Sequence, residues 1–232
     1  MNESRRSMLL GFSGFALGAL VLPACQSPRQ QVVSARRVAY APGSQTARIS
    51  DAHAGYAAPA SAPQAPTCGL TEANIEGPYY RAFAPRRSNL SGQAEGVPLE
   101  LRGRVLSADC SSPLSGAVVD IWHADSHGHY DNDGSDTMGQ GFHFRGVVAA
   151  DARGEYSVKT IVPGRYLNGR QYRPAHVHVK LSAAGHAPLT TQLYFPGDPF
   201  NDVDPFIKKS LVIDMEGKDE KRGRYDFVLS AA

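Results

Sequence analysis

Short apolar runs recur along the chain from residue 98 to the C-terminus, and many of them alternate apolar with polar positions. Alternation with a period of two is typical of half-buried β-strands. Turn sequences such as Pro163-Gly164 separate the runs, and no segment of this region has a sustained helical period. The pattern predicts an all-β fold, an antiparallel β-sandwich of about eight strands with long loops. The expected strands are residues 99–106, 117–123, 142–148, 156–161, 176–181, 190–195, 210–213 and 225–229.

The first 25 residues break this pattern and are typical of an export signal. Arg5 and Arg6 resemble the pair of a twin-arginine signal, and the apolar stretch at 8–22 is short for a membrane span. Residues 22–25, Leu-Pro-Ala-Cys, resemble a lipoprotein cleavage box, in which a lipidated Cys25 would attach the protein to a membrane. The alternative is an ordinary cleaved signal that removes Cys25. We therefore expect an exported protein, either periplasmic or anchored as a lipoprotein facing the periplasm.

Residues 26–67 are rich in Ala, Pro, Ser and Gln and have no sustained apolar period. Such a segment cannot bury enough apolar surface to fold, so we expect a disordered linker followed by a folded domain at 68–232. If Cys25 carries lipid or is removed, Cys68 and Cys110 remain as an even pair. An oxidising compartment predicts a disulfide between them, and two unpaired buried thiols are the alternative.

Length and charge narrow the range of functions. The 232 residues are enough for one domain with appendages, and 23 glycines and 16 prolines suit many strands joined by turns. The chain has 24 Lys and Arg against 22 Asp and Glu, a formal charge of +2. Because no basic stripe with interleaved aromatic residues appears, we expect no nucleic-acid partner.

Two histidines, His176 and His178, lie two positions apart in an expected strand. Side chains at i and i+2 of a strand point to the same face, so the two imidazoles project together. Pro174 favours an extended conformation at Arg173, so the strand is entered without a helical turn. Such a pair is a two-point chelate that suits iron, copper, zinc and nickel alike. Two plain surface or core residues are the alternative.

Further motifs accompany this pair. Tyr130 ends the run Asp-Ile-Trp-His-Ala-Asp-Ser-His-Gly-His-Tyr, Tyr166 ends Thr-Ile-Val-Pro-Gly-Arg-Tyr, and Gln192 lies in Thr-Thr-Gln-Leu-Tyr-Phe. With Arg-Pro-Ala-His-Val-His at 173–178, Gly-Pro-Tyr-Tyr at 77–80, Phe-Arg-Gly at 144–146 and Gly-Asp-Pro-Phe at 197–200, these motifs resemble the intradiol ring-cleaving dioxygenases. That family includes protocatechuate 3,4-dioxygenase and catechol 1,2-dioxygenase. The resemblance spans about residues 68–215 and uses several motifs in order.

The resemblance implies a non-haem Fe(III) site with four protein ligands, Tyr130, Tyr166, His176 and His178. It also implies that Tyr166 leaves the metal when a catechol binds through both of its oxygens. Arg173 takes the position that stabilises negative charge on the ring, and Gln192 takes that of an amide near the substrate. The implied reaction uses O2 to cleave a small aromatic diol between its hydroxylated carbons, giving a cis,cis-muconate-type product.

The chemistry of these ligands agrees with ferric iron. Phenolate is a hard anionic oxygen donor, whereas zinc or cuprous copper would recruit thiolates or more imidazoles. Fe(III), two phenolates and one hydroxide sum to zero charge, which allows a partly buried site. Most tyrosines pack in cores, so Tyr130 and Tyr166 stand out only through their motifs. The alternative for Arg173 is an ion pair with Asp120 or Asp125, and for Gln192 a surface position.

Three classes of function compete for this sequence. The first is an exported intradiol dioxygenase that acts on a protocatechuate-like or catechol-like compound. The second is a non-catalytic exported protein that binds a metal or a ligand, and the third is a transthyretin-like interaction module without metal. The complete set of two tyrosines, two histidines, Arg173 and Gln192 favours the first. The sequence leaves the identity of the catechol open, and also whether the protein is a homo-oligomer.

Overall fold

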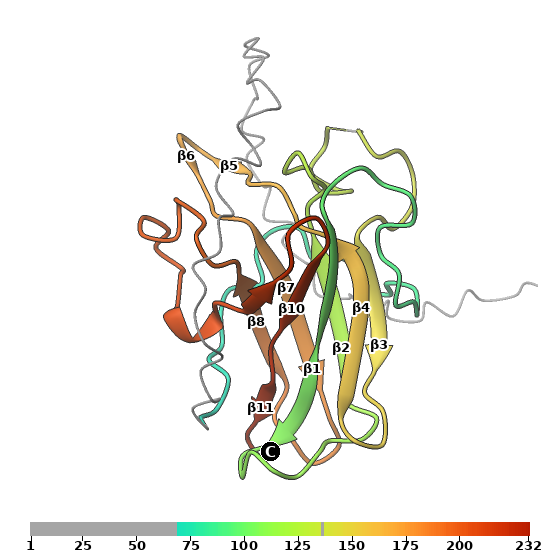
Figure 1. The fold of residues 1–232 in the computed structure, drawn as a ribbon. Helices are drawn as coiled ribbons and strands as arrows, with labels where there is room; N and C mark the ends of the chain where they lie inside the picture. Colours follow the sequence, from blue (N-terminus) through green and yellow to red (C-terminus); the bar gives the residue numbers. More distant parts are fainter. Residues whose placement is uncertain (1–68, 136) are drawn as a thin grey trace, which may run out of the picture. The chain divides into compact units, whose positions relative to one another are not determined.

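The computed structural model describes residues 69–135 and 137–232, and within them nearly all regular structure is β (Figure 1). The predicted all-β sandwich is confirmed. The expected export signal, the linker at 26–67, Cys25 and Cys68 lie outside the described residues. The strands are β1 (Pro98–Ser107), β2 (Val118–His123), β3 (Arg145–Ala149), β4 (Glu155–Ile161), β5 (Leu167–Asn168), β6 (Gln171–Tyr172), β7 (His176–Ser182), β8 (Leu189–Tyr194), β9 (Asp214–Glu216), β10 (Lys221–Arg224) and β11 (Phe227–Leu229).

One sheet is organised around the long strand β1. Along one edge β1 pairs antiparallel with β4, from Pro98 opposite Ile161 to Arg104 opposite Glu155. Along its other edge β1 pairs in parallel, first with β10 and then with β11. The sandwich is therefore mainly antiparallel, with parallel pairing where the C-terminal strands return beside β1.

The second sheet has the order β3-β2-β7-β8 and is antiparallel throughout. Its central strand β7 is buried over nearly its whole length, with only its last residue exposed. A strand that is buried on both faces is covered by other structure on both sides. Val177, Val179 and Leu181 face the core between the sheets, and His176 and His178 therefore face away from it.

The hydrophobic core lies between the two sheets and draws residues from both. Leu101 on β1, Val158 on β4 and Phe227 on β11 come from the first sheet, and Ile121 on β2 and Val179 on β7 from the second. Each of these side chains is at most 1% exposed. Alternation on β4 follows the expected period of two, with every second residue from Tyr156 onward buried. The inward residues thus fix the register of the strands that carry the site.

The expected strand at 210–213 is wrong. A single 3-10 turn, η2 (Lys209–Leu211), occupies its first half, and β9 and β10 follow after it. Leu211 and Ile213 are nevertheless buried, at 0% and 3% exposure, and the Ile213 amide donates to the Tyr194 carbonyl. These two apolar side chains are therefore buried, but an irregular segment and not a strand places them there. The short hairpin of β5 and β6 was also not expected.

Cys110 takes part in a disulfide bond. Since Cys68 lies outside the described residues, the pairing of Cys68 with Cys110 stays a prediction. Between residues 69 and 232, the described positions include no helix with the length and hydropathy that a bilayer span requires.

Candidate metal centre

His176 and His178 lie side by side on the outer face of β7, as the spacing predicts, and their ring centroids are 4.8 Å apart. Both are almost fully buried, at 2% and 1% exposure. The Nδ1 of His176 lies 2.7 Å from the carbonyl oxygen of Pro174. A carbonyl only accepts, so Nδ1 carries the proton and Nε2 keeps its lone pair. The backbone thus orients this imidazole with its free nitrogen towards the site.

His178 is held between an indole and a glycine. Its ring stacks on Trp122 of β2, with centroids 4.8 Å apart and planes inclined by 8°. On the segment before β1, Gly77 has a φ of +73°, and a β-carbon there would lie 3.1 Å from Cε1 of His178. A side chain at that position would therefore meet both backbone strain and the imidazole. Among the described residues, the buried Nδ1 of His178 has no hydrogen-bond partner.

Tyr130 and Tyr166 reach the histidines from two loops, one after β2 and the other after β4. The hydroxyl of Tyr130 lies 3.5 Å from Nε2 of His176, and the rings of Tyr166 and His176 have centroids 5.7 Å apart. The two tyrosine rings are 5.9 Å apart and nearly perpendicular. Tyr130 is 2% exposed, whereas Tyr166 is half-buried. The structure thus brings together all four side chains that the motifs singled out.

The loops that carry Tyr130 and Tyr166 contact one another closely through their glycines. The Gly164 amide donates to the Asp125 carbonyl over 2.7 Å. A β-carbon on Gly164 would lie 2.5 Å from the Gly128 nitrogen, and one on Gly128 would lie 2.2 Å from the Arg165 carbonyl oxygen. Real β-carbons do not approach backbone atoms so closely, so this contact requires glycine on both sides. The contact fixes the spacing of Tyr130 and Tyr166.

The donor set fits a hard metal ion. No group of three or more His, Cys, Asp or Glu side chains forms a metal site in the described part of the chain. An ion at the two histidines would therefore need other ligands, and the tyrosine oxygens are the donors that converge there. The unpartnered Nδ1 of His178 also shows that this imidazole is not satisfied by the protein alone, as buried polar groups usually are. Two imidazoles and two phenolates would suit a trivalent ion.

Burial sets the protonation of these groups. Burial, with the nearby Arg173 cation, lowers the pKa of His176 to about 3. Burial and the neighbouring His176 hold the pKa of His178 well below its ordinary value. Both imidazoles are therefore neutral, as metal ligation requires. Burial raises the pKa of Tyr130, and the nearby Tyr166 raises it further. A Tyr130 phenolate consequently needs strong positive charge beside it, which a bound cation would supply.

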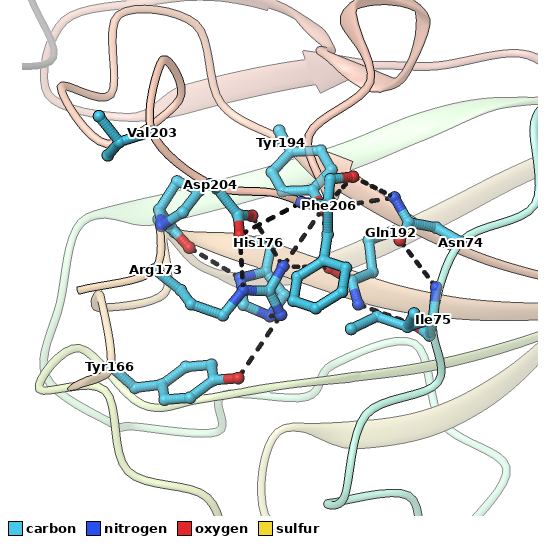
Figure 2. A network of polar contacts seen from close by, with 12 residues as sticks. Asn74, Ile75, Tyr166, Arg173, His176, Gln192, Tyr194, Val203, Asp204 and Phe206 are labelled. Carbon is cyan, nitrogen blue, oxygen red and sulfur yellow. Dashed lines mark hydrogen bonds and ion pairs between the residues drawn. The ribbon is translucent and has the colours of Figure 1, made fainter. Parts of the chain in front are cut away.

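Arg173 lies beside the ligands and is 3% exposed. Its Nη1 is 3.4 Å from Nε2 of His176 and 3.5 Å from the Tyr166 hydroxyl (Figure 2). The expected alternative, an ion pair with Asp120 or Asp125, is wrong, because Arg173 pairs with Asp204 on the loop before η2. Burial alone lowers the pKa of Arg173, but the hydrogen bonds with Asp204 and Tyr166 raise it above its ordinary value. The guanidinium is therefore a permanent cation at the site.

Asp120 and Asp125 have other partners. The Asp120 carboxylate accepts a hydrogen bond from the Tyr80 hydroxyl over 3.2 Å. Asp125 accepts from the backbone amides of His127 and His129, and so shapes the turn that leads to Tyr130. Both carboxylates therefore support segments around the site rather than Arg173.

Gln192 on β8 is fully buried and lies opposite His178 in the register of β7 and β8. Its Oε1 accepts from Nη2 of Arg173 and from the Tyr194 hydroxyl, each over 2.9 Å. Its Nε2 donates to the Ile75 carbonyl over 2.7 Å. The alternative surface position is thus wrong. The amide links Arg173 to the segment before β1 (Figure 2).

Three buried arginine–aspartate pairs, which the sequence motifs did not reveal, support the ligand loops. Asp131, next to Tyr130, pairs with Arg145 of β3 and with Arg81. The other two pairs are Arg165 with Asp198, and Arg173 with Asp204. All three aspartate side chains have 0% exposure. Arg145 and Asp198 lie in quoted motifs, but nothing in a single sequence shows which charges pair across a fold.

The other histidines of the first tyrosine motif do not join the cluster. His123 is buried and lies 2.7 Å from both the Ala124 carbonyl oxygen and the Thr160 hydroxyl. Burial lowers its pKa to about 4. His127 is exposed, and His129 contacts Asp133 at 3.2 Å. None of these three histidines is therefore part of the cluster, and the contact of His129 with Asp133 helps to hold the loop that carries Tyr130.

Comparison with known proteins points to one family. A family model described as "Dioxygenase" matches residues 75–231. The chain is 35% identical over 165 residues to a catechol 1,2-dioxygenase of Acinetobacter baylyi, a match that covers 62% of this chain and 53% of the relative. It is 36% identical over 154 residues to a chlorocatechol 1,2-dioxygenase of a Pseudomonas species, covering 56% of this chain and 57% of the relative. The chain thus spans little more than half the length of these curated relatives.

Solved structures give the same result for the fold. The dioxygenase domain of a dioxygenase–carbohydrate-binding fusion from Streptomyces sp. SirexAA-E has a TM-score of 0.63 and 38% identity, and the match covers 71% of this chain and 100% of that one. The 3-chlorocatechol 1,2-dioxygenase of Rhodococcus opacus 1CP has a TM-score of 0.65 and 27% identity, covering 70% of this chain and 73% of that one.

Proposed function

The chain belongs to the intradiol dioxygenase family, and from this premise we propose that it is an exported enzyme that cleaves a catecholic ring with O2. The bond cleaved joins the two hydroxylated carbons, and the product is of the cis,cis-muconate type. The observation that carries the proposal is the convergence of two tyrosines and two neutral histidines beside a buried arginine. The disulfide at Cys110 supports export, because such bonds persist in oxidising compartments.

In the proposed site Tyr130, Tyr166, His176 and His178 hold ferric iron. The bound ion would supply a strong Lewis acid that draws electron density from a coordinated catecholate and so makes the ring reactive towards O2. Two phenolates and a hydroxide balance the charge of the ion, so the buried site needs no further anion. A catecholate dianion in place of the hydroxide and one phenolate would keep the same charge balance.

Exposure separates the roles of the two tyrosines. Tyr130 is 2% exposed and packs on Tyr79, with ring centroids 4.4 Å apart. Tyr166 is half-buried, and its hydroxyl faces Nη1 of Arg173 at 3.5 Å. In our proposal Tyr166 would be the ligand that leaves, and its phenolate oxygen would take up one of the two catechol protons, while the hydroxide would take up the other. Tyr130 stays in place because its ring is enclosed.

Arg173 is proposed to stabilise the negative charge that develops on the ring. Its guanidinium is 3% exposed, and its Nη1 points towards the ligand cluster. A fixed cation in a site that excludes water can contribute roughly 3 to 4 kcal/mol to a transition state of this kind. Because Asp204 and Gln192 already hold the guanidinium, little reorganisation is needed during the reaction.

The charges around the site favour a catechol without an acidic substituent. Arg145, Arg165 and Arg173, which adjoin the ligands, are each paired with a buried aspartate, and Arg81 shares Asp131 with Arg145. A substrate carboxylate could recruit one of them only by breaking a buried ion pair, which is costly. The names of the curated relatives refer to catechol, chlorocatechol and hydroxyquinol. We therefore propose a catechol-like rather than a protocatechuate-like substrate.

The test is O2 uptake by the iron-loaded full chain with catechol, 4-chlorocatechol, hydroxyquinol and protocatechuate. We expect uptake with one of the first three, and mass spectrometry with ¹⁸O2 should find both atoms in a ring-opened acid. Tyr130→Phe should abolish turnover, while Tyr172→Phe, at an exposed tyrosine of the β5–β6 hairpin, should not. Full iron occupancy without uptake on any of the four compounds would overturn the proposal. It would favour a non-catalytic metal- or ligand-binding protein.

A further inference from the structure

We propose that Asp204 is a positioning residue that holds the Arg173 guanidinium against the ligand cluster and balances its charge. The inference rests on the proposed function only for its kinetic consequences. Asp204 lies on the loop between β8 and η2, in the sequence Asn-Asp-Val-Asp-Pro, which looks like an ordinary polar turn. Of its two aspartates, Asp202 is exposed and Asp204 is buried.

The contact between Asp204 and Arg173 is two-pronged (Figure 2). Nε of Arg173 donates to Oδ1 over 3.2 Å, and Nη2 donates to Oδ2 over 2.8 Å. The side chains of Asp204 and Arg173 are 0% and 4% exposed. A bidentate contact fixes the plane of the guanidinium as well as its position. A single contact would leave the group free to rotate about the bond.

The remaining donors of the guanidinium then point in defined directions. Nη2 also donates to Gln192 over 2.9 Å and to the Tyr194 hydroxyl over 3.3 Å. Nη1 is the nitrogen that lies 3.5 Å from the Tyr166 hydroxyl and 3.4 Å from Nε2 of His176. Asp204 therefore binds the edge of the guanidinium that points away from the metal ligands. Nη1 is the nitrogen that points towards these ligands.

Charge gives Asp204 a second effect. Arg173 is a buried cation next to a site that we expect to hold a trivalent ion, and a cation in such a place is costly unless it is paired. Two phenolates and a hydroxide would only just balance the charge of the ion, so none of these anions is left to balance the charge of Arg173. The Asp204 carboxylate balances the arginine separately. Without it, repulsion from the ion would favour rotation of the guanidinium away from Tyr166 and His176.

The loop that carries Asp204 is tied to distant parts of the domain. The Asp204 amide donates to the Phe200 carbonyl over 3.1 Å. Two residues on, the Phe206 carbonyl accepts from Asn74 over 2.8 Å and from the Tyr194 hydroxyl over 3.2 Å. The ring of Phe206 lies 4.9 Å from the guanidinium carbon of Arg173. The carboxylate is thus held by the fold rather than by a freely moving turn.

The kinetic test compares Asp204→Asn with Asp202→Asn, the exposed aspartate of the same loop. Displacement of a reacting or stabilising group by about 1 Å can cost roughly a hundredfold in rate, so we expect kcat to fall about a hundredfold in Asp204→Asn. We expect KM to change little, because in the proposed site the catechol oxygens bind the metal ion and do not contact Asp204. Asp202→Asn should leave both constants unchanged. Equal behaviour of the two variants would overturn the proposal.

A double-mutant cycle shows whether Asp204 acts through Arg173. If it does, Asp204→Asn combined with Arg173→Gln should be no slower than Arg173→Gln alone. If the rate losses of the two single variants multiplied in the double variant, Asp204 would act independently of Arg173, and the proposal would be contradicted. Should Asp204→Asn fail to fold, Asp204→Glu keeps the charge but moves the carboxylate by one methylene. A folded Asp204→Glu with wild-type kcat would also overturn the positioning role.

A measurement on the metal-free chain separates this inference from the proposed function. In the ¹H–¹⁵N spectrum, the Nε–H of a buried, bonded arginine exchanges slowly with water. Arg173→Lys identifies the Arg173 signal by its disappearance. We expect the signal to survive in Asp202→Asn and to be lost or to exchange rapidly in Asp204→Asn. An unchanged signal in Asp204→Asn would refute the positioning role even if the chain proved not to cleave catechols.

Discussion

The buried pair of Arg145 and Asp131 allows a quantitative prediction about the support of Tyr130. Asp131 follows Tyr130 directly, and its Oδ1 accepts from Nε of Arg145 over 2.7 Å. Its Oδ2 accepts from Arg81 over 2.9 Å and from the His143 amide over 3.0 Å. Replacement of Asp131 by Asn keeps the shape of the side chain but removes the negative charge that pairs with Arg145 and Arg81.

The size of the effect follows from burial. The side chains of Asp131 and Arg145 are 0% and 1% exposed, so Asp131→Asn leaves an uncompensated buried guanidinium. Breaking a buried pair in this way costs about 3 to 5 kcal/mol. The Asn oxygen can still accept one hydrogen bond, so we expect a loss near 3 kcal/mol, or roughly 6 to 12 °C in Tm for a domain of this size. Since Tyr130 is adjacent, iron affinity should fall as well.

The assay is thermal unfolding followed by circular dichroism, together with iron titration of the folded protein. Glu216→Gln is the matched control, because Glu216 and Arg222 form an ion pair with side chains 64% and 54% exposed. An exposed pair contributes about 0 to 1 kcal/mol, so the control should lose at most a few degrees in Tm. If Asp131→Asn lost no more stability than Glu216→Gln, the claim that this pair anchors the Tyr130 loop would be refuted.

Three further predictions concern the loops and the edge of the domain. Gly164→Ala would place a β-carbon 2.5 Å from the Gly128 nitrogen, so it should part the two tyrosine loops and weaken iron binding in a titration; wild-type affinity would contradict this. A hydrogen bond from a serine hydroxyl, with backbone amides, lowers the pKa of Asp109 to about 2. The unfolded value is about 3.9, so this stabilisation is complete above that pH and lost as pH falls towards 2. Asp109→Asn should therefore lower Tm near neutral pH and have progressively less effect on Tm as pH falls through 2. Mass spectrometry without reductant should find a peptide that joins Cys68 to Cys110, and two free thiols would refute the bridge.

Much of the fold was predictable because strand alternation is a local property. The period of two at β4 and the alternation of histidine and valine at β7 each depend on neighbours within one segment. The prediction of a strand at 210–213 was wrong because it also relied on a local pattern alone. Leu211 and Ile213 are apolar because they face the core, and a short apolar run does not distinguish a strand from an irregular segment that reaches the same core. Parallel pairing of β10 and β11 with β1 depends on residues more than 100 positions apart.

The candidate site was predictable only as far as its motifs reach. His176 and His178 share a face by local geometry, whereas Tyr130 and Tyr166 were singled out by resemblance to a family. Their convergence depends on contacts such as Gly164 against Gly128, which no local pattern contains. The partner of Arg173 was misjudged because sequence shows charges but not distances. Asp204 lies 31 positions away in a polar turn, and only the folded chain brings it to the arginine.

The visible spectrum of the iron-loaded protein tests the central claim most directly, namely that Tyr130 and Tyr166 bind the metal together with the two histidines. Phenolate coordination to ferric iron should produce a strong charge-transfer band. Anaerobic addition of a catechol should shift the band, Tyr130→Phe should weaken it, and Tyr172→Phe should leave it unchanged. A colourless protein that holds one ferric ion per chain would contradict the account.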